Sequence, residues 1–217
     1  MKFQRFTAAA VGALALCGSA TAAADTFDVT VTNVSQNQLF TPILVVTHRP
    51  SVRLFSLGEP ASQGIAEVAE SGDPTELEAA LRATGRVKDA QNLGVFLAPG
   101  ESATVSVKAD WQHRRISLVG MLLPTNDGMI AVNSVRIPHY GTKTVTAIGY
   151  DAGTEINDQL CDNIPGGGGC SGEGFNAEDG EGFVHVHPGI HDTGDLTGAA
   201  YDWNNPMAVV KIRRSTY

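Results

Sequence analysis

The fold is decided by a short stretch near the N-terminus, Phe27-Asp28-Val29-Thr30-Val31-Thr32. Its apolar side chains alternate with polar ones, and this two-residue period is typical of a β-strand with one buried face. Similar strand-like segments, separated by Gly, Pro and Asn, follow at residues 42–48, 103–109, 115–123, 129–137, 144–148, 183–187 and 207–213. Many short strands with few helical patterns predict an all-β protein, folded as an antiparallel β-sandwich or barrel.

One segment departs from this pattern. Asp73-Pro74-Thr75-Glu76 combines an N-cap residue, a proline suited to the first helical position and a glutamate three residues after the cap. Apolar residues between Leu77 and Leu81 then recur on one face, and Gly85 ends the run. We therefore expect a short helical insertion around residues 60–85, packed beside the sheets.

Residues 1–24 are predicted to be a cleaved signal peptide. A short basic start precedes an apolar run at residues 8–16, and the alanine-rich end suits a signal peptidase that cuts after Ala24. No later stretch reaches the roughly 20 apolar residues that a membrane helix needs. We expect residues 25–217 to form a single exported domain, either periplasmic or secreted.

The charge of the chain narrows the choice of partners. The formal net charge is −8, and loss of the two basic residues of the signal peptide would bring it to about −10. Such an acidic surface argues against nucleic-acid binding, which requires clustered Lys and Arg, and it suits a divalent cation.

Two cysteines, Cys161 and Cys170, remain after the signal peptide is removed. In an oxidising compartment we expect them to pair and to close the loop 162–169, which contains four consecutive glycines. Such a disulfide would stabilise the fold by about 2–3 kcal/mol because it restricts the unfolded chain. A cysteine zinc site is not expected, because there is no second cysteine pair.

Two acidic turns follow strand-like segments. They are Leu123-Pro124-Thr125-Asn126-Asp127 and Tyr150-Asp151-Ala152-Gly153-Thr154-Glu155. A hard cation such as calcium is held by carboxylate and carbonyl oxygens at roughly 2.3–2.6 Å, and loops supply these oxygens. If both turns lie at the same end of a β-sandwich, they form a calcium site. The other interpretation is that the acids are solvated turn residues, since Asn126-Asp127-Gly128 is a good hairpin turn on its own.

These motifs resemble the spondin N-terminal domain, in the form found in small exported bacterial proteins. The resemblance covers most of residues 25–217. Further motifs in the same order are Gln38-Leu39-Phe40-Thr41-Pro42, Gly58-Glu59-Pro60-Ala61-Ser62, Gly189-Ile190-His191, Gly194-Asp195-Leu196 and Tyr201-Asp202-Trp203-Asn204-Asn205-Pro206. Several ordered motifs in one chain are more specific than any one of them.

The resemblance implies an antiparallel β-sandwich of C2-like character. In the animal proteins the domain belongs to secreted matrix proteins involved in cell adhesion. It binds calcium, and by motif the ligands here would be Asp127, Asp151 and Glu155. Gly128 stands where the animal form has Trp, and Glu155 replaces an Asp but still supplies a carboxylate. The implied function is a calcium-binding, non-enzymatic module for adhesion or envelope binding, whose unidentified partner could be anionic.

Two other hypotheses remain open. On a strand, residues two apart share a face, so His185 and His187 could bind one ion, with His191 arriving from the following turn. Three imidazoles and an open position would make a catalytic zinc site, and hence a zinc-dependent hydrolase. The remaining hypothesis is a structural envelope protein whose acidic turns bind no metal.

Overall fold

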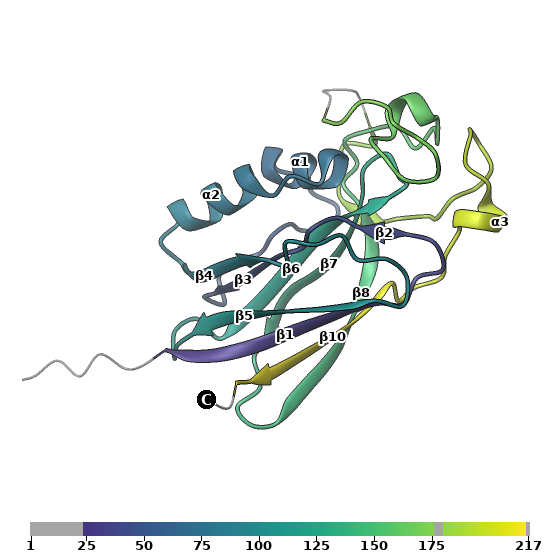
Figure 1. Cartoon of the computed structure of the whole chain (residues 1–217). Helices are drawn as coiled ribbons and strands as arrows, with labels where there is room; N and C mark the ends of the chain where they lie inside the picture. Colours follow the sequence, from purple (N-terminus) through teal and green to yellow (C-terminus); the bar gives the residue numbers. More distant parts are fainter. Residues whose placement is uncertain (1–23, 176–179, 216–217) are drawn as a thin grey trace, which may run out of the picture.

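The fold is an antiparallel β-sheet that turns back on itself (Figure 1). The computed structural model describes residues 24–175 and 180–215. Within them the strands are β1 (Asp25–Asn33), β2 (Leu39–Phe40), β3 (Leu44–His48), β4 (Val87–Asn92), β5 (Ser102–Ala109), β6 (Arg115–Leu123), β7 (Gly128–Arg136), β8 (Thr142–Asp151), β9 (His185–Val186) and β10 (Ala208–Arg214). Their order is β4-β3-β6-β7-β8-β10-β1-β5, with β2 added to β6 and β9 added to β8.

The two halves of the sheet enclose the main core. β5, β1 and β10 form one half and β7, β6, β3 and β4 the other, and the long strand β8 pairs with both β7 and β10. Alternate residues of β1, including Phe27, Val29 and Val31, point inward and meet Leu118 and Ile130 from the other half. The predicted all-β, sandwich-like architecture is therefore confirmed.

The helices cover the outer face of one half. α1 (Gln63–Ser71) and α2 (Thr75–Ala83) lie above β3, β4, β6 and β7 (Figure 1). Ile65, Val68 and Leu77 pack there against Leu44 and Met129 in a second core. The predicted helical insertion around residues 60–85 is confirmed. Beyond this insertion, only short helical turns occur in the described chain, at Cys161–Asn163 and in α3 (Gly198–Tyr201).

The edge strands β4 and β5, which end the strand order, lie next to each other, and side chains of β4 and of the neighbouring strand β3 bond to β5. Asp89 Oδ2 accepts the backbone N–H of Lys108 at 2.8 Å, and the Thr47 hydroxyl donates to the Lys108 carbonyl at 2.6 Å. The sheet thus approaches a closed barrel without a continuous backbone ladder across the gap.

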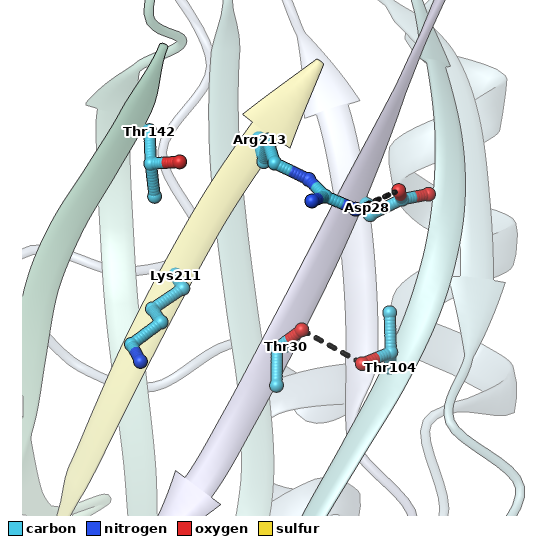
Figure 2. A pocket seen from close by; sticks show the side chains of 6 residues that line it. All are labelled: Asp28, Thr30, Thr104, Thr142, Lys211 and Arg213. Atoms are coloured by element: carbon cyan, nitrogen blue, oxygen red, sulfur yellow. Dashed lines mark hydrogen bonds and ion pairs between the residues drawn. The ribbon is translucent and has the colours of Figure 1, made fainter. Parts of the chain in front are cut away.

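The outer face of β8, β10, β1 and β5 is polar. A shallow hollow of about 400 Å³ lies there (Figure 2), lined by Asp28, Thr30, Thr104, Thr142, Lys211 and Arg213. The hydroxyls of Thr30 and Thr104 are hydrogen-bonded at 2.7 Å, and Arg213 lies 3.5 Å from Asp28. Asp28, Thr30, Thr104 and Arg213 thus pair with one another across the strands.

The predicted signal peptide falls almost wholly on residues 1–23, which lie outside the described part of the chain. Within the described part, no helix is both long enough and apolar enough to cross a membrane.

Candidate metal site

The two acidic turns meet at one end of the sheet. β7 begins directly after Asp127 and β8 ends at Asp151, and antiparallel pairing places Gly128 opposite Asp151. The backbone N–H groups of Thr154 and Glu155 donate to Asp127 Oδ2 at 2.7 and 3.2 Å. The predicted convergence of the turns is therefore confirmed. Figure 1 shows this end of the sheet beneath the long loops that follow β8.

The three predicted acids are shielded from solvent. Asp127 and Asp151 are 0% exposed and Glu155 is 2% exposed. Asp127 Oδ1 is buried and has no hydrogen-bond partner among the described residues. In the same part of the chain, no lysine or arginine lies within 4.0 Å of Asp127 or Asp151. A buried carboxylate without a compensating cation is costly, so this arrangement favours a bound cation.

The pKa values reflect the same shortage of positive charge. Burial raises the pKa of Asp127, although the backbone N–H groups of Thr154 and Glu155 oppose the shift. Burial, reinforced by the charge of Asp127, raises the pKa of Asp151 to about 7. The two carboxylates thus repel each other in a buried region, and a divalent cation would relieve that repulsion.

A histidine and a fourth acid approach Asp151 from the edge of β8 that does not pair with β7. β9 pairs with β8 and sets His185 opposite Asp151. His185 Nε2 lies 3.3 Å from Asp151 Oδ1 and 3.8 Å from Glu181 Oε2. In the described chain these three residues form the one group of potential ligands whose donor atoms all lie within 4.8 Å of one another. Asp127 and Glu155 stand outside that group.

The three histidines do not assemble into the predicted catalytic zinc site. His187 is buried against Trp203, with ring centroids 4.8 Å apart, and its Nδ1 accepts the Gly189 N–H. Burial lowers its pKa to about 3, so the ring is neutral and carries its proton on Nε2, 4.0 Å from Asp151 Oδ2. His191 is exposed on the following loop. The three-imidazole arrangement is therefore not supported.

Comparison with known proteins identifies the family. The Spondin_N family model matches residues 28–158, which is more than half of the chain. This chain belongs to the spondin N-terminal domain family. No curated protein matches it. The matched region of this spondin domain contains Asp127, Asp151 and Glu155, whereas Glu181 and His185 lie beyond it.

Close backbone packing brings Glu181 and His185 to the spondin domain's acidic turns. Gly153 has a φ of +69°, and a Cβ there would lie 2.3 Å from the carbonyl oxygen of Phe183. Its own carbonyl accepts the Gly182 N–H at 2.8 Å. Only glycine allows this approach. Sequence reasoning missed Glu181, because nothing local to Gly180-Glu181-Gly182 signals a contact made through distant strands.

The turn that carries Asp127 is held from the other side by the loop after Glu155. Asn126 donates to Asp158 at 3.0 Å and accepts the Gln159 N–H at 3.1 Å. The predicted disulfide between Cys161 and Cys170 is present. The glycine loop that it closes packs on the chain before Asp127, since a Cβ at Gly167 would lie 3.1 Å from the Pro124 nitrogen.

Proposed function

We propose that this protein is an exported calcium-binding spondin module that acts in binding or adhesion. Family membership and the all-β fold support an extracellular β-module. The observation that carries the calcium proposal is the buried Asp127, whose Oδ1 has no partner among the described residues and whose charge adds to that of Asp151.

The ligands would be carboxylate oxygens of Asp127, Asp151 and Glu155. Calcium accepts oxygen ligands in flexible geometry, so small movements of these side chains could complete a coordination sphere together with backbone carbonyls and water. Bound calcium would neutralise the cluster and fix the two turns relative to each other. It would also add a positive centre at which an anionic partner could supply a further ligand.

Export is supported by the predicted leader and by the disulfide between Cys161 and Cys170, which is typical of oxidising compartments. The acidic chain, with a formal net charge of −8, also suits an ion-dependent extracellular domain.

Isothermal titration calorimetry with calcium tests this function. We expect one site with an affinity in the range of extracellular modules, Kd about 10⁻⁴–10⁻³ M. Asp127→Asn should weaken binding at least tenfold, whereas Asp162→Asn, which changes an exposed acid of the neighbouring loop, should leave it unchanged. Absence of calcium binding by the wild-type protein would favour the metal-free structural hypothesis instead.

A further inference from the structure

The imidazole of His185 faces two carboxylates. Its Nε2 lies 3.3 Å from Asp151 Oδ1 and 3.8 Å from Glu181 Oε2. This nitrogen is buried and has no hydrogen-bond partner among the described residues, although the side chain as a whole is 25% exposed. The ring therefore presents a shielded nitrogen to a pair of anionic oxygens.

The other ring nitrogen fixes which tautomer is present. His185 Nδ1 lies 3.0 Å from the carbonyl oxygen of Val186. A carbonyl can only accept, so Nδ1 carries a proton and donates it. In the neutral ring the lone pair of Nε2 then points at the oxygens of Asp151 and Glu181. Lone pairs repel in such an arrangement unless a proton or a metal ion lies between them. Metal-binding histidines commonly donate their second N–H to a backbone carbonyl in this way.

The distances suit a small ion with nitrogen and oxygen ligands. Zinc binds both donor types at about 2.0–2.1 Å, and tetrahedral geometry then separates neighbouring donors by about 3.3 Å. The contact between Asp151 and His185 has that length, 3.3 Å. Glu181 is about half an ångström more distant, and its side chain is 39% exposed, so it is free to adjust. Imidazole suits zinc, whereas calcium prefers oxygen ligands.

A second, buried histidine lies close to Asp151. The side chain of His187 is 1% exposed, and its Nε2 has no hydrogen-bond partner among the described residues. Because Nδ1 accepts the Gly189 N–H, the proton lies on Nε2, and this nitrogen is 4.0 Å from Asp151 Oδ2, beyond hydrogen-bonding distance. Asn157 donates to the same oxygen at 2.6 Å. The other oxygen, Oδ1, accepts the Gly153 N–H at 2.8 Å and lies 3.3 Å from His185 Nε2, so it retains a second lone pair for an ion.

We propose that Asp151, Glu181 and His185 form a binding site for zinc, next to the proposed calcium position and sharing Asp151 with it. Three protein ligands leave a fourth position open for water or for a carboxylate of a partner. The inference stands on the contacts of His185 and Glu181 and does not require that calcium bind at Asp127.

Zinc binding to the chelator-stripped mature protein tests the proposal. Calorimetry with zinc alone should detect one site, and His185→Gln and Glu181→Gln should each weaken it at least tenfold. Glu181 is exposed, so its variant should fold normally and keeps the test valid if His185→Gln misfolds. His191→Gln is the matched control, because it removes an exposed histidine six residues from His185 and should change the affinity less than threefold. Cobalt(II) substitution should give visible absorption bands that disappear in His185→Gln.

The zinc proposal and the calcium proposal can be tested independently of each other. Asp127→Asn should reduce calcium binding far more than zinc binding, and His185→Gln should do the reverse. The proposal is overturned if the wild-type protein binds no zinc, or if His185→Gln and Glu181→Gln bind zinc as tightly as the wild type. It is also overturned if His191→Gln loses as much affinity as His185→Gln, which would restore the three-imidazole arrangement. Calcium binding could survive each of these results.

Discussion

Replacing Asp151 by asparagine should stabilise the calcium-free protein. Burial and the charge of Asp127 raise the pKa of Asp151 from 3.8 to about 7. The folded state therefore holds this proton more tightly than the unfolded chain does. The resulting stabilisation is fully present below about pH 4 and is lost as the pH rises to about 7. A pKa difference of about 3 corresponds to about 4 kcal/mol, which sets the cost of the ionised carboxylate above neutral pH.

The Asp151→Asn variant should not gain all of this ~4 kcal/mol in its free energy of unfolding. Asp151 Oδ2 accepts a hydrogen bond from Asn157 at 2.6 Å, and loss of a bond to a charged group costs about 1.5–3 kcal/mol. We therefore expect a net gain of about 1–2.5 kcal/mol in the absence of calcium. For a domain of this size the melting temperature rises by about 2–4 °C per kcal/mol.

Calcium should offset most or all of the variant's stability advantage. With about 10 mM calcium and a Kd of about 10⁻⁴–10⁻³ M, the wild type should gain about 1.4–2.7 kcal/mol, while Asp151→Asn should gain none. Differential scanning calorimetry near pH 7.5, in a chelator and then in calcium, measures both effects, with magnesium as the ionic control. The reasoning is refuted if the variant melts below the wild type in the chelator, or if it retains the calcium-dependent rise.

Three further predictions concern the scaffold. Burial lowers the pKa of His48, so its contribution to stability is present above its unfolded pKa of about 6.5 and falls as the pH drops. Urea unfolding near pH 7.5 and pH 5.5 measures this effect. Between these two values the free energy of unfolding should fall more in the wild type than in His48→Gln, by up to about 1.4 kcal/mol per pH unit. Removing the disulfide with Cys161→Ser and Cys170→Ser should lower the free energy of unfolding by about 2–3 kcal/mol, and an unchanged urea midpoint would contradict this. Gly153→Ala should lower the free energy of unfolding by on the order of 2–4 kcal/mol. The control Gly141→Ala has a similar φ of +66° but open space around its Cβ, so it should cost only about 1–2 kcal/mol. Equal losses in the two variants would exclude the close approach to Phe183 as the cause.

Most of the sheet could be predicted from the sequence, because its strands carry a period of two or a continuous apolar run. The segment Arg115–Leu123 was predicted with the bounds that the structure has. β4 was missed, since Val87-Lys88-Asp89-Ala90-Gln91-Asn92 is an edge strand with mostly polar side chains. The short strand β2 was missed as well, because two residues carry no periodicity.

The site could be predicted only in part. Asp127 directly precedes one recognisable strand and Asp151 ends the next, so their convergence followed from the motif resemblance and from antiparallel pairing. Glu181 reaches Asp151 only because β9 pairs with β8 and Gly153 packs on the chain near Phe183. The grouping of His185 with carboxylates instead of with His191 has the same non-local cause. Spacing along the chain does not record such contacts.

The side-chain contacts that β3 and β4 make with β5 also affect how one molecule can associate with another. An unpaired edge strand offers a row of amide and carbonyl groups to which a second polypeptide can add, and this is a common route to aggregates. Here Asp89 and Thr47 occupy the amide and the carbonyl of Lys108. Both backbone groups of Lys108 are therefore unavailable to the strand of another molecule, which protects this point of the seam from edge-to-edge association.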